Sequence, residues 1–363
     1  MIRDCQASRF HPSRPWHGVR SRARIRTSPR LRARNSAKLP RIREAADFMG
    51  LFVGVTDGDW YELLARQPGL DEVNFWQPGG NIQFKALSPG ELFLFKLHSP
   101  DNFIVGGGVF AHASLLPVSL AWDSFGIKNG ATTIVEMRAR IEKYRRQPAT
   151  SHEDYRIGCI ILTQPFFFPR DRWIPVPASW KPNIVQGKKY SHDEVDGRAL
   201  WRAVQDAMQD ARADAIAAQP AAVLTAADAG PRFGAPTLVR PRLGQGSFRV
   251  VVTDAYARRC AVTKERTLPV LEAAHIKPYA DGGEHRIDNG LLLRRDLHTL
   301  FDLGYLSVTP TLQLEVSRRL KDDWENGREY YEMHGRELSL PMAVGERPRA
   351  EYLAWHRETR WLG

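Results

Sequence analysis

The chain has 363 residues, of which 43% are hydrophobic and 26% are charged, enough material for two domains with packed cores. No run of eighteen apolar residues occurs, so the sequence predicts no segment that spans a membrane and no membrane partner. The three cysteines lie far apart and form no CxxC pair, which argues against a disulfide framework, predicts no structural zinc and fits a reducing cytoplasm.

The formal net charge of +11 is concentrated at one end of the chain. Residues 1–48 hold 13 Lys and Arg against three Asp and Glu, and the remaining residues carry a net charge of only +1. We expect 1–48 to be a disordered basic extension. It is either an arm that contacts phosphates or a stretch upstream of a translation start at Met49, where "MGLFVGVTD" begins abruptly like a first strand; this abrupt onset favours the second. The total charge therefore does not indicate a function.

Residues 49–200 are expected to form a first domain rich in strands. Short runs such as "LFVGVT", "ELFLFKLHS" and "IGCIILTQPFFFP" are rich in Phe, Val and Ile and are separated by Gly and Pro, a pattern typical of a small β-barrel. Helical spacing predicts flanking helices over Trp60–Gln67 and Thr132–Gln147, the second with a Thr cap. Five phenylalanines are expected in the core: Phe93, Phe95, Phe103, Phe166 and Phe167.

Residues 201–244 are expected to join two domains. An Ala-rich helix over 199–218 precedes a stretch rich in Ala, Pro and Gly, which is typical of a linker. The second domain is expected over 245–363, and "FRVVVTDAYARRC" predicts a helix or strand at its start.

Inside the second domain, "AAHIKPYADGGEHRIDNGLLLRRDLHTLFD" (Ala273–Asp302) predicts the order strand, loop, strand, helix. The first strand ends at His275, and "GLLL" after Asn289 is the second. Asp296 is the expected N-cap of a helix over Leu297–Leu303 that stops at Gly304.

The polar residues of this stretch suit metal-assisted hydrolysis of a phosphodiester. His298 and Asp302 are four residues apart on the predicted helix, so one face presents both to a single cation. Imidazole with carboxylate accepts Mg, Mn, Co, Ni or Zn and does not select among them. An unliganded His275 can act as general base on water. Asn289 can orient that ring through its other nitrogen or through adjacent backbone.

The order His…Asn…His with "NGLLL" and "DLHTLFD" resembles HNH endonucleases, which have a ββα-metal fold. The resemblance covers about Cys260 to Val308. It implies that His275 is the general base, Asn289 the orienting residue and His298 a metal ligand, with Asp302 where some members carry a further ligand. Two features depart from the family: Ala274 stands where an Asp or His often contributes to the metal site, and the paired cysteines of a structural zinc are missing.

Basic residues around this stretch indicate contacts to a nucleic-acid backbone, although a solvated surface would have the same composition. Eight Lys and Arg lie between Arg232 and Arg266, against Asp254 and Glu265. The candidates for DNA-backbone contacts are Arg258, Arg259, Lys264 and Lys277.

In the first domain, "GELFLFKLHSPDNFIVGGGVFA" and "QPFFFPRDRWIPVP" resemble the EVE branch of the PUA-like superfamily. Members are small curved β-barrels that hold modified bases in an aromatic pocket, and relatives are fused to nucleases in modification-dependent restriction. A flipped base needs aromatic faces and a few polar groups that read its edge. The candidates for such a pocket are Asn74, Trp76, His98 and Trp122.

Together these features predict an α+β protein, with an EVE/PUA-like small β-barrel and flanking helices followed by a ββα-metal HNH domain. The predicted function is a metal-dependent DNA endonuclease of restriction type that acts on modified DNA, with a homodimer on DNA for double-strand cutting. Two alternatives remain open. One is an unselective or nicking HNH nuclease whose barrel is a scaffold, and the other is a catalytically decayed nucleic-acid-binding protein.

Overall fold

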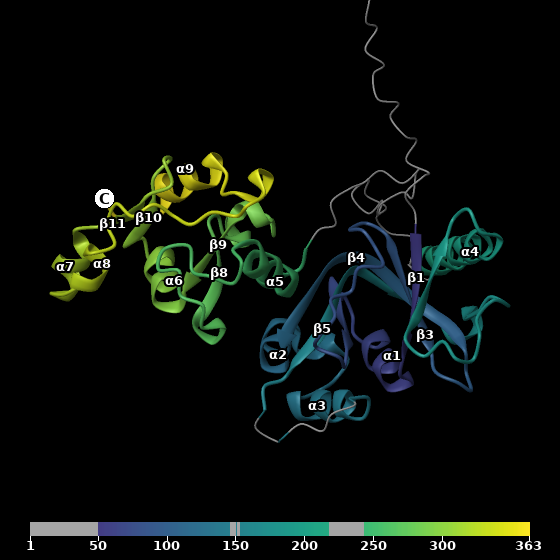
Figure 1. Ribbon diagram of the computed structural model, residues 1–363. Helices are drawn as coiled ribbons and strands as arrows, with labels where there is room; N and C mark the ends of the chain where they lie inside the picture. The colour runs from purple at the N-terminus through teal and green to yellow at the C-terminus, as the bar shows by residue number, and fades with distance from the viewer. Residues whose placement is uncertain (1–49, 146–149, 151–152, 218–242) are drawn as a thin grey trace, which may run out of the picture. The chain divides into compact units, whose positions relative to one another are not determined.

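The computed structural model describes residues 50–145, 150, 153–217 and 243–363, and for 211–217 the backbone alone (Figure 1). The predicted basic extension over 1–48 and most of the predicted linker lie outside the described residues. Helices and strands occur together throughout the described ranges, so the predicted α+β class is confirmed. Within these ranges, no helix is both long and apolar enough to cross a membrane.

The first domain, which we call the sheet domain, is a seven-stranded sheet. Its order is β2-β5-β4-β3-β1-β7, with β6 paired to β4. Strands β1 and β3 run parallel, and the other pairs are antiparallel. Register shifts interrupt the pairing of the long β4 with β3 and β5, and such shifts allow a sheet to bend. The strands are β1 (Gly50–Thr56), β2 (Glu72–Gln77), β3 (Leu92–Leu97), β4 (Phe103–Pro117), β5 (Arg156–Phe167), β6 (Ile174–Pro175) and β7 (Gly187–Ser191).

Four helices accompany the sheet: α1 (Gly58–Ala65), α2 (Val118–Phe125), α3 (Ile134–Glu142) and α4 (Val195–Ala217). The predicted Thr cap is present, because the Thr133 hydroxyl accepts a hydrogen bond from the Glu136 amide at 3.1 Å. Helix α2 was not predicted.

An aromatic cluster fills the space between α1 and the sheet. Phe93 and Phe95 are fully buried there with Trp60, as predicted. Phe103 was predicted in the core, but it is 37% exposed. The reason is its position as the first residue of β4, where its ring contacts Trp173 at the domain surface.

The second domain contains the predicted strand, loop, strand and helix. Strands β8 (Leu271–His275) and β9 (Gly290–Arg294) pair antiparallel, with His275 opposite Gly290, and α6 (Arg295–Asp302) follows directly. The predicted start of this helix was wrong by two residues. Asp296 is not its N-cap, because the Asp296 carboxylate instead accepts two hydrogen bonds from the Arg294 guanidinium at 2.7 and 2.6 Å.

Further elements surround this unit. Helix α5 (Gln245–Ala255) packs against β8 and β9, and α9 (Ala350–Thr359) packs against β10. A continuous apolar core runs through all of them, including the fully buried Phe248, Leu291 and Phe301. The remaining elements are β10 (Leu306–Val308), β11 (Leu314–Val316), α7 (Arg319–Trp324) and α8 (Arg328–Tyr331).

The start of α5 is bound by a carboxylate from the sheet domain. Glu72, the first residue of β2, is fully buried and accepts hydrogen bonds from the Gly246 and Ser247 amides at 2.9 Å each, and from the Ser247 hydroxyl. Lys128 balances this charge at 3.0 Å. A carboxylate at a helix N-terminus satisfies amides that have no partner in the helix, so Glu72 stabilises the first turn of α5.

Candidate active site

His275 is held at the end of β8 by two aromatic neighbours. Its ring stacks on Phe248 of α5, with 3.7 Å between ring centroids and 12° between ring planes. Its Nε2 lies 2.9 Å from Nδ1 of His285, in the loop between β8 and β9. Burial, with the neighbouring His285 and His298, lowers the pKa of His275 to about 4. The ring is therefore neutral at pH 7, the state in which an imidazole accepts a proton.

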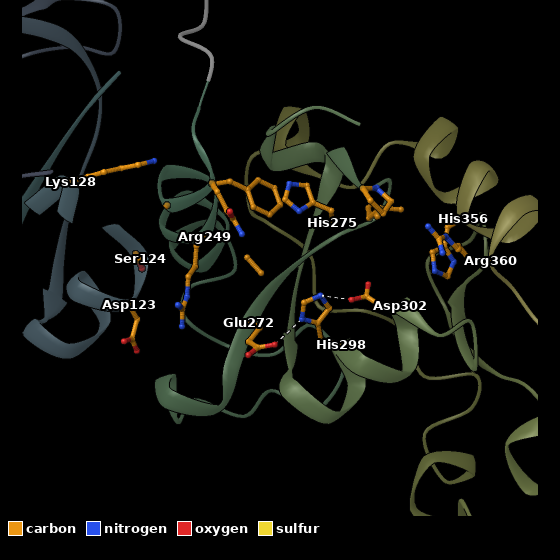
Figure 2. A pocket seen from close by; sticks show the side chains of 16 residues that line it. Asp123, Ser124, Lys128, Arg249, Glu272, His275, His298, Asp302, His356 and Arg360 are labelled. Atoms are coloured by element: carbon orange, nitrogen blue, oxygen red, sulfur yellow. Dashed lines mark hydrogen bonds and ion pairs between the residues drawn. The ribbon is translucent and has the colours of Figure 1, made fainter. Parts of the chain in front are cut away.

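His298 and Asp302 meet on one face of α6, as their spacing predicts. His298 Nε2 lies 3.2 Å from an Asp302 oxygen, and His298 Nδ1 lies 2.9 Å from Glu272 Oε2 (Figure 2). Arg295 donates to the second Glu272 oxygen at 2.7 Å. Burial would lower the pKa of His298, but the hydrogen bonds and charges of Asp302 and Glu272 outweigh it and raise that pKa.

The His298 and Asp302 side chains fit a divalent cation as a two-residue site. Glu272 accepts from Nδ1, which leaves the lone pair of Nε2 beside the Asp302 carboxylate once His298 is neutral. Ala274 is buried in the core. Among the described residues, no three His, Cys, Asp or Glu side chains are placed to hold a metal together. Other ligands would have to come from water or phosphate, which oxygen-preferring cations accept.

Asn289 closes the loop that carries His285. This buried amide accepts from the Lys277 amide and donates to the Lys277 and Glu284 carbonyls, each at 2.9 Å. The loop is tight, because a Cβ atom on Gly283 would lie 1.9 Å from the Lys277 carbonyl oxygen. Two orienting roles were predicted for Asn289. It makes the predicted contact with adjacent backbone, but not the one with the His275 ring, whose Nε2 contacts His285 instead.

A cavity of about 720 Å³ brings these groups together (Figure 2). His275, His298, Asp302 and Glu272 all line it, and Figure 2 shows the dashed contacts from His298 to both carboxylates. Cationic side chains, Arg249 among them, also line the cavity. Its lining offers a base, a cation site and positive charge to an anionic substrate.

A comparison with protein families decides what this arrangement is. A family model described as HNH endonuclease matches residues 260–309. These residues are an HNH endonuclease domain. The prediction of an HNH nuclease, an enzyme that hydrolyses phosphodiester bonds, is thereby confirmed. The matched range contains His275, Asn289, His298 and Asp302.

No curated protein matches the sequence of this chain. Two solved structures show weak similarity to it. The structure of ASCH from Zymomonas mobilis is 9% identical, with a TM-score of 0.29, and the match covers 42% of this chain and 94% of that one. The structure titled "Modification dependent TagI restriction endonuclease" is 13% identical, with a TM-score of 0.26, covering 86% of this chain and 81% of that one.

The four candidates for a base pocket are spread over β2, α2 and the segment after β3 in the sheet domain. Asn74 is fully buried and donates to Asn129, and Trp76 donates to the Asn129 carbonyl at 3.0 Å. His98 stacks on Tyr144, and its side chain is 45% exposed. Trp122 lies on α2 and packs against the core there. None of the four lines the cavity that His275 and His298 line.

The candidates for DNA-backbone contacts differ in whether their charged groups are bound by other residues of the protein. The Arg258 guanidinium is bound to Asp254 at 3.1 Å and to the Leu115 carbonyl at 2.7 Å, so it acts as a contact within the protein. Lys277 lies over the Trp355 ring, 5.6 Å from its centroid. Phosphate contacts by Arg259, Lys264 and Lys277 stay a prediction.

Sequence reasoning missed three contributors to the site: Phe248, Glu272 and His285. The last two had a signal. His285 lies in the turn-rich loop between two strands whose pairing returns the chain to His275. Glu272 lies three residues before His275 on the same strand, β8. Phe248 had none, because it lies 27 residues upstream of His275 and only the fold brings the two rings together.

Proposed function

We propose that this protein is a metal-dependent DNA endonuclease of restriction type, directed to DNA with modified bases by its sheet domain. The observation that carries the proposal is the convergence of His275, His298 and Asp302 on one cavity inside an HNH endonuclease domain. A base and a cation site that share one cavity meet the two needs of phosphodiester hydrolysis, an activated water and compensation of phosphate charge.

In the proposed reaction, His275 accepts a proton from a water molecule as the water oxygen attacks phosphorus. The bond from phosphorus to the leaving sugar oxygen breaks, and that oxygen is protonated from solvent. A divalent cation held by His298 and Asp302 would compensate the negative charge that develops on the phosphate and leaving oxygen. Mg, Mn, Co, Ni and Zn all accept this ligand pair. Glu272 fixes the His298 ring, and Phe248 fixes the His275 ring.

The sheet domain is proposed to select the substrate. Its support is the resemblance of its "ELFLFKLHS" and "IVG" strands to EVE domains, and the aromatic and amide side chains of Trp76, His98, Trp122 and Asn74. A single HNH site cuts one strand at a time, so we propose that two copies act together on a duplex. The described cysteines, Cys159 and Cys260, are free thiols, as a reducing compartment such as the cytoplasm keeps them.

The experiment that tests this proposal is cleavage of a panel of duplexes by the full chain with Mg, Mn, Co, Ni or Zn. The panel pairs phage DNA containing modified cytosine with the same sequence unmodified. We expect cation-dependent cleavage of the modified member and much slower cleavage of its plain partner. Equal cleavage of both would favour an unselective nuclease. DNA binding without cleavage under any of these cations would favour a decayed one.

A further inference from the structure

We propose that His285 is a proton relay for His275, so that the general base of this nuclease is a pair of histidines. The proposal rests on the proposed nuclease function and names a residue that neither the family match nor the sequence motif assigns. The observation that carries it is the distance of 2.9 Å between His275 Nε2 and His285 Nδ1.

The contact, with the tautomer that we propose for it, sets which nitrogen of His275 can act on water. A hydrogen bond between two neutral imidazoles needs one N–H donor and one lone-pair acceptor. If Nε2 of His275 donates to Nδ1 of His285, then Nδ1 of His275 keeps its lone pair. That Nδ1 is bonded to no group within the described residues, and His275 lines the cavity. Nδ1 of His275 is therefore the atom that accepts the proton from water.

The relay step then follows with all protons accounted for. When Nδ1 of His275 takes a proton from water, the ring carries a proton on each nitrogen. Its Nε2 proton moves to Nδ1 of His285, and His285 releases the proton on its own Nε2 to solvent. His275 is left protonated on Nδ1, and return of one proton through the same path with loss of the Nδ1 proton to solvent restores the starting tautomer. No oxidant, reductant or further reactant takes part.

The surroundings of the two rings suit transfer in this direction. His275 is the more enclosed ring, packed on the fully buried Phe248, so a charge there is costly. His285 is half-buried, and its ring is parallel to that of Tyr279, with centroids 4.9 Å apart; Tyr279 is 69% exposed. A proton that moves from His275 to His285 thus moves toward water.

Charged groups near each ring favour the same direction. His275 feels His285, His298 and Asp302, of which the two histidines disfavour its charge and the carboxylate favours it. Burial lowers the pKa of His285 as well; among the charged groups, the carboxylates of Glu72 and Asp71 favour a charge there and Lys128 opposes it.

The geometry of the loop holds the pair in place. Asn289 binds the Glu284 carbonyl directly before His285 and the Lys277 backbone two residues after His275. Both ends of the loop are thus tied to one buried side chain, which holds the backbone that carries the two imidazoles.

The test compares His285→Gln with His285→Ala in the full chain under saturating divalent cation. The glutamine oxygen can still accept from His275 Nε2, so it keeps the ring oriented, but an amide cannot pass a proton on. We expect both variants to lower kcat about tenfold with KM unchanged, and added imidazole to restore His285→Ala but not His285→Gln. His192→Ala, remote in sequence and outside the site, is the matched control and keeps the unmodified rate with and without imidazole.

A kcat of His285→Gln equal to that of the unmodified chain would overturn the relay and leave only a positioning role. An unmodified chain that cleaves no DNA with any cation contradicts the nuclease function instead, so the two failures are distinguishable. Nitrogen NMR of the imidazoles in the folded chain without metal gives a readout that does not need cleavage. We expect His275 in the tautomer protonated on Nε2, and a His275 protonated on Nδ1 would overturn the proposal.

Discussion

Replacing Asn289 by alanine tests whether one buried amide holds the loop that positions the catalytic pair. The substitution removes three hydrogen bonds of 2.9 Å, two with the Lys277 backbone and one with the Glu284 carbonyl. At about 1 kcal/mol for each bond, the folded loop loses about 3 kcal/mol. Since 1.4 kcal/mol corresponds to tenfold in an equilibrium, the loop opens about a hundredfold more often.

Hydrogen exchange measured by mass spectrometry on the peptide covering 276–289 reads this opening directly, because the Lys277 amide donates to the Asn289 side chain and the Ile276 amide donates to the Asn289 main-chain carbonyl. We expect exchange of these amides about a hundredfold faster in Asn289→Ala, and a parallel fall in cleavage rate. Asn326→Ala is the control, since Asn326 lies at an exposed turn where its side chain accepts one hydrogen bond, from Gly327. If the amides of this peptide exchange in Asn289→Ala at a rate within threefold of their rate in the unmodified chain, the reasoning is refuted.

Three further predictions concern the base, the cation and the contact between the domains. Because burial lowers the pKa of His275 to about 4, the base stays neutral as the pH falls through 6.5, and the single-turnover rate at saturating cation should halve only near pH 4; a midpoint at pH 6.5 or above would contradict this. Asp302→Asn removes one carboxylate of the cation site and should weaken Mn binding in calorimetry at least tenfold, whereas an unchanged Kd would place the cation elsewhere. Glu72→Gln removes the charge that accepts from the Gly246 and Ser247 amides, so the start of α5 should lose about 2 kcal/mol; unchanged hydrogen exchange over 245–255 would disprove this role.

Local pattern was enough to predict the framework of the site. The spacing of His298 and Asp302, the Gly-rich loop and the apolar runs on either side are properties of a continuous stretch of about thirty residues. The antiparallel pairing of β8 and β9 follows from these signals, and the register that sets His275 opposite Gly290 agrees with them. Helix α6 was predicted too, although its first residues were not, because the Arg294 to Asp296 contact competes with capping.

Contacts between distant segments could not be predicted from pattern. Phe248 reaches His275 only because the apolar core packs α5 against β8. His285 reaches His275 only because Asn289 folds the loop back on itself. In the sheet domain, the sequence predicts Asn74 as pocket lining, whereas this residue lies buried within β2, where it donates to Asn129.

The central claim is that His275 and the His298–Asp302 pair hydrolyse DNA together with a divalent cation. The most direct measurement is single-turnover cleavage of modified phage DNA by the full chain and by His275→Ala, with binding to the same DNA measured in parallel. The account predicts cation-dependent cleavage that falls at least a hundredfold in His275→Ala while binding is retained. Cleavage by His275→Ala at the rate of the unmodified chain would contradict it.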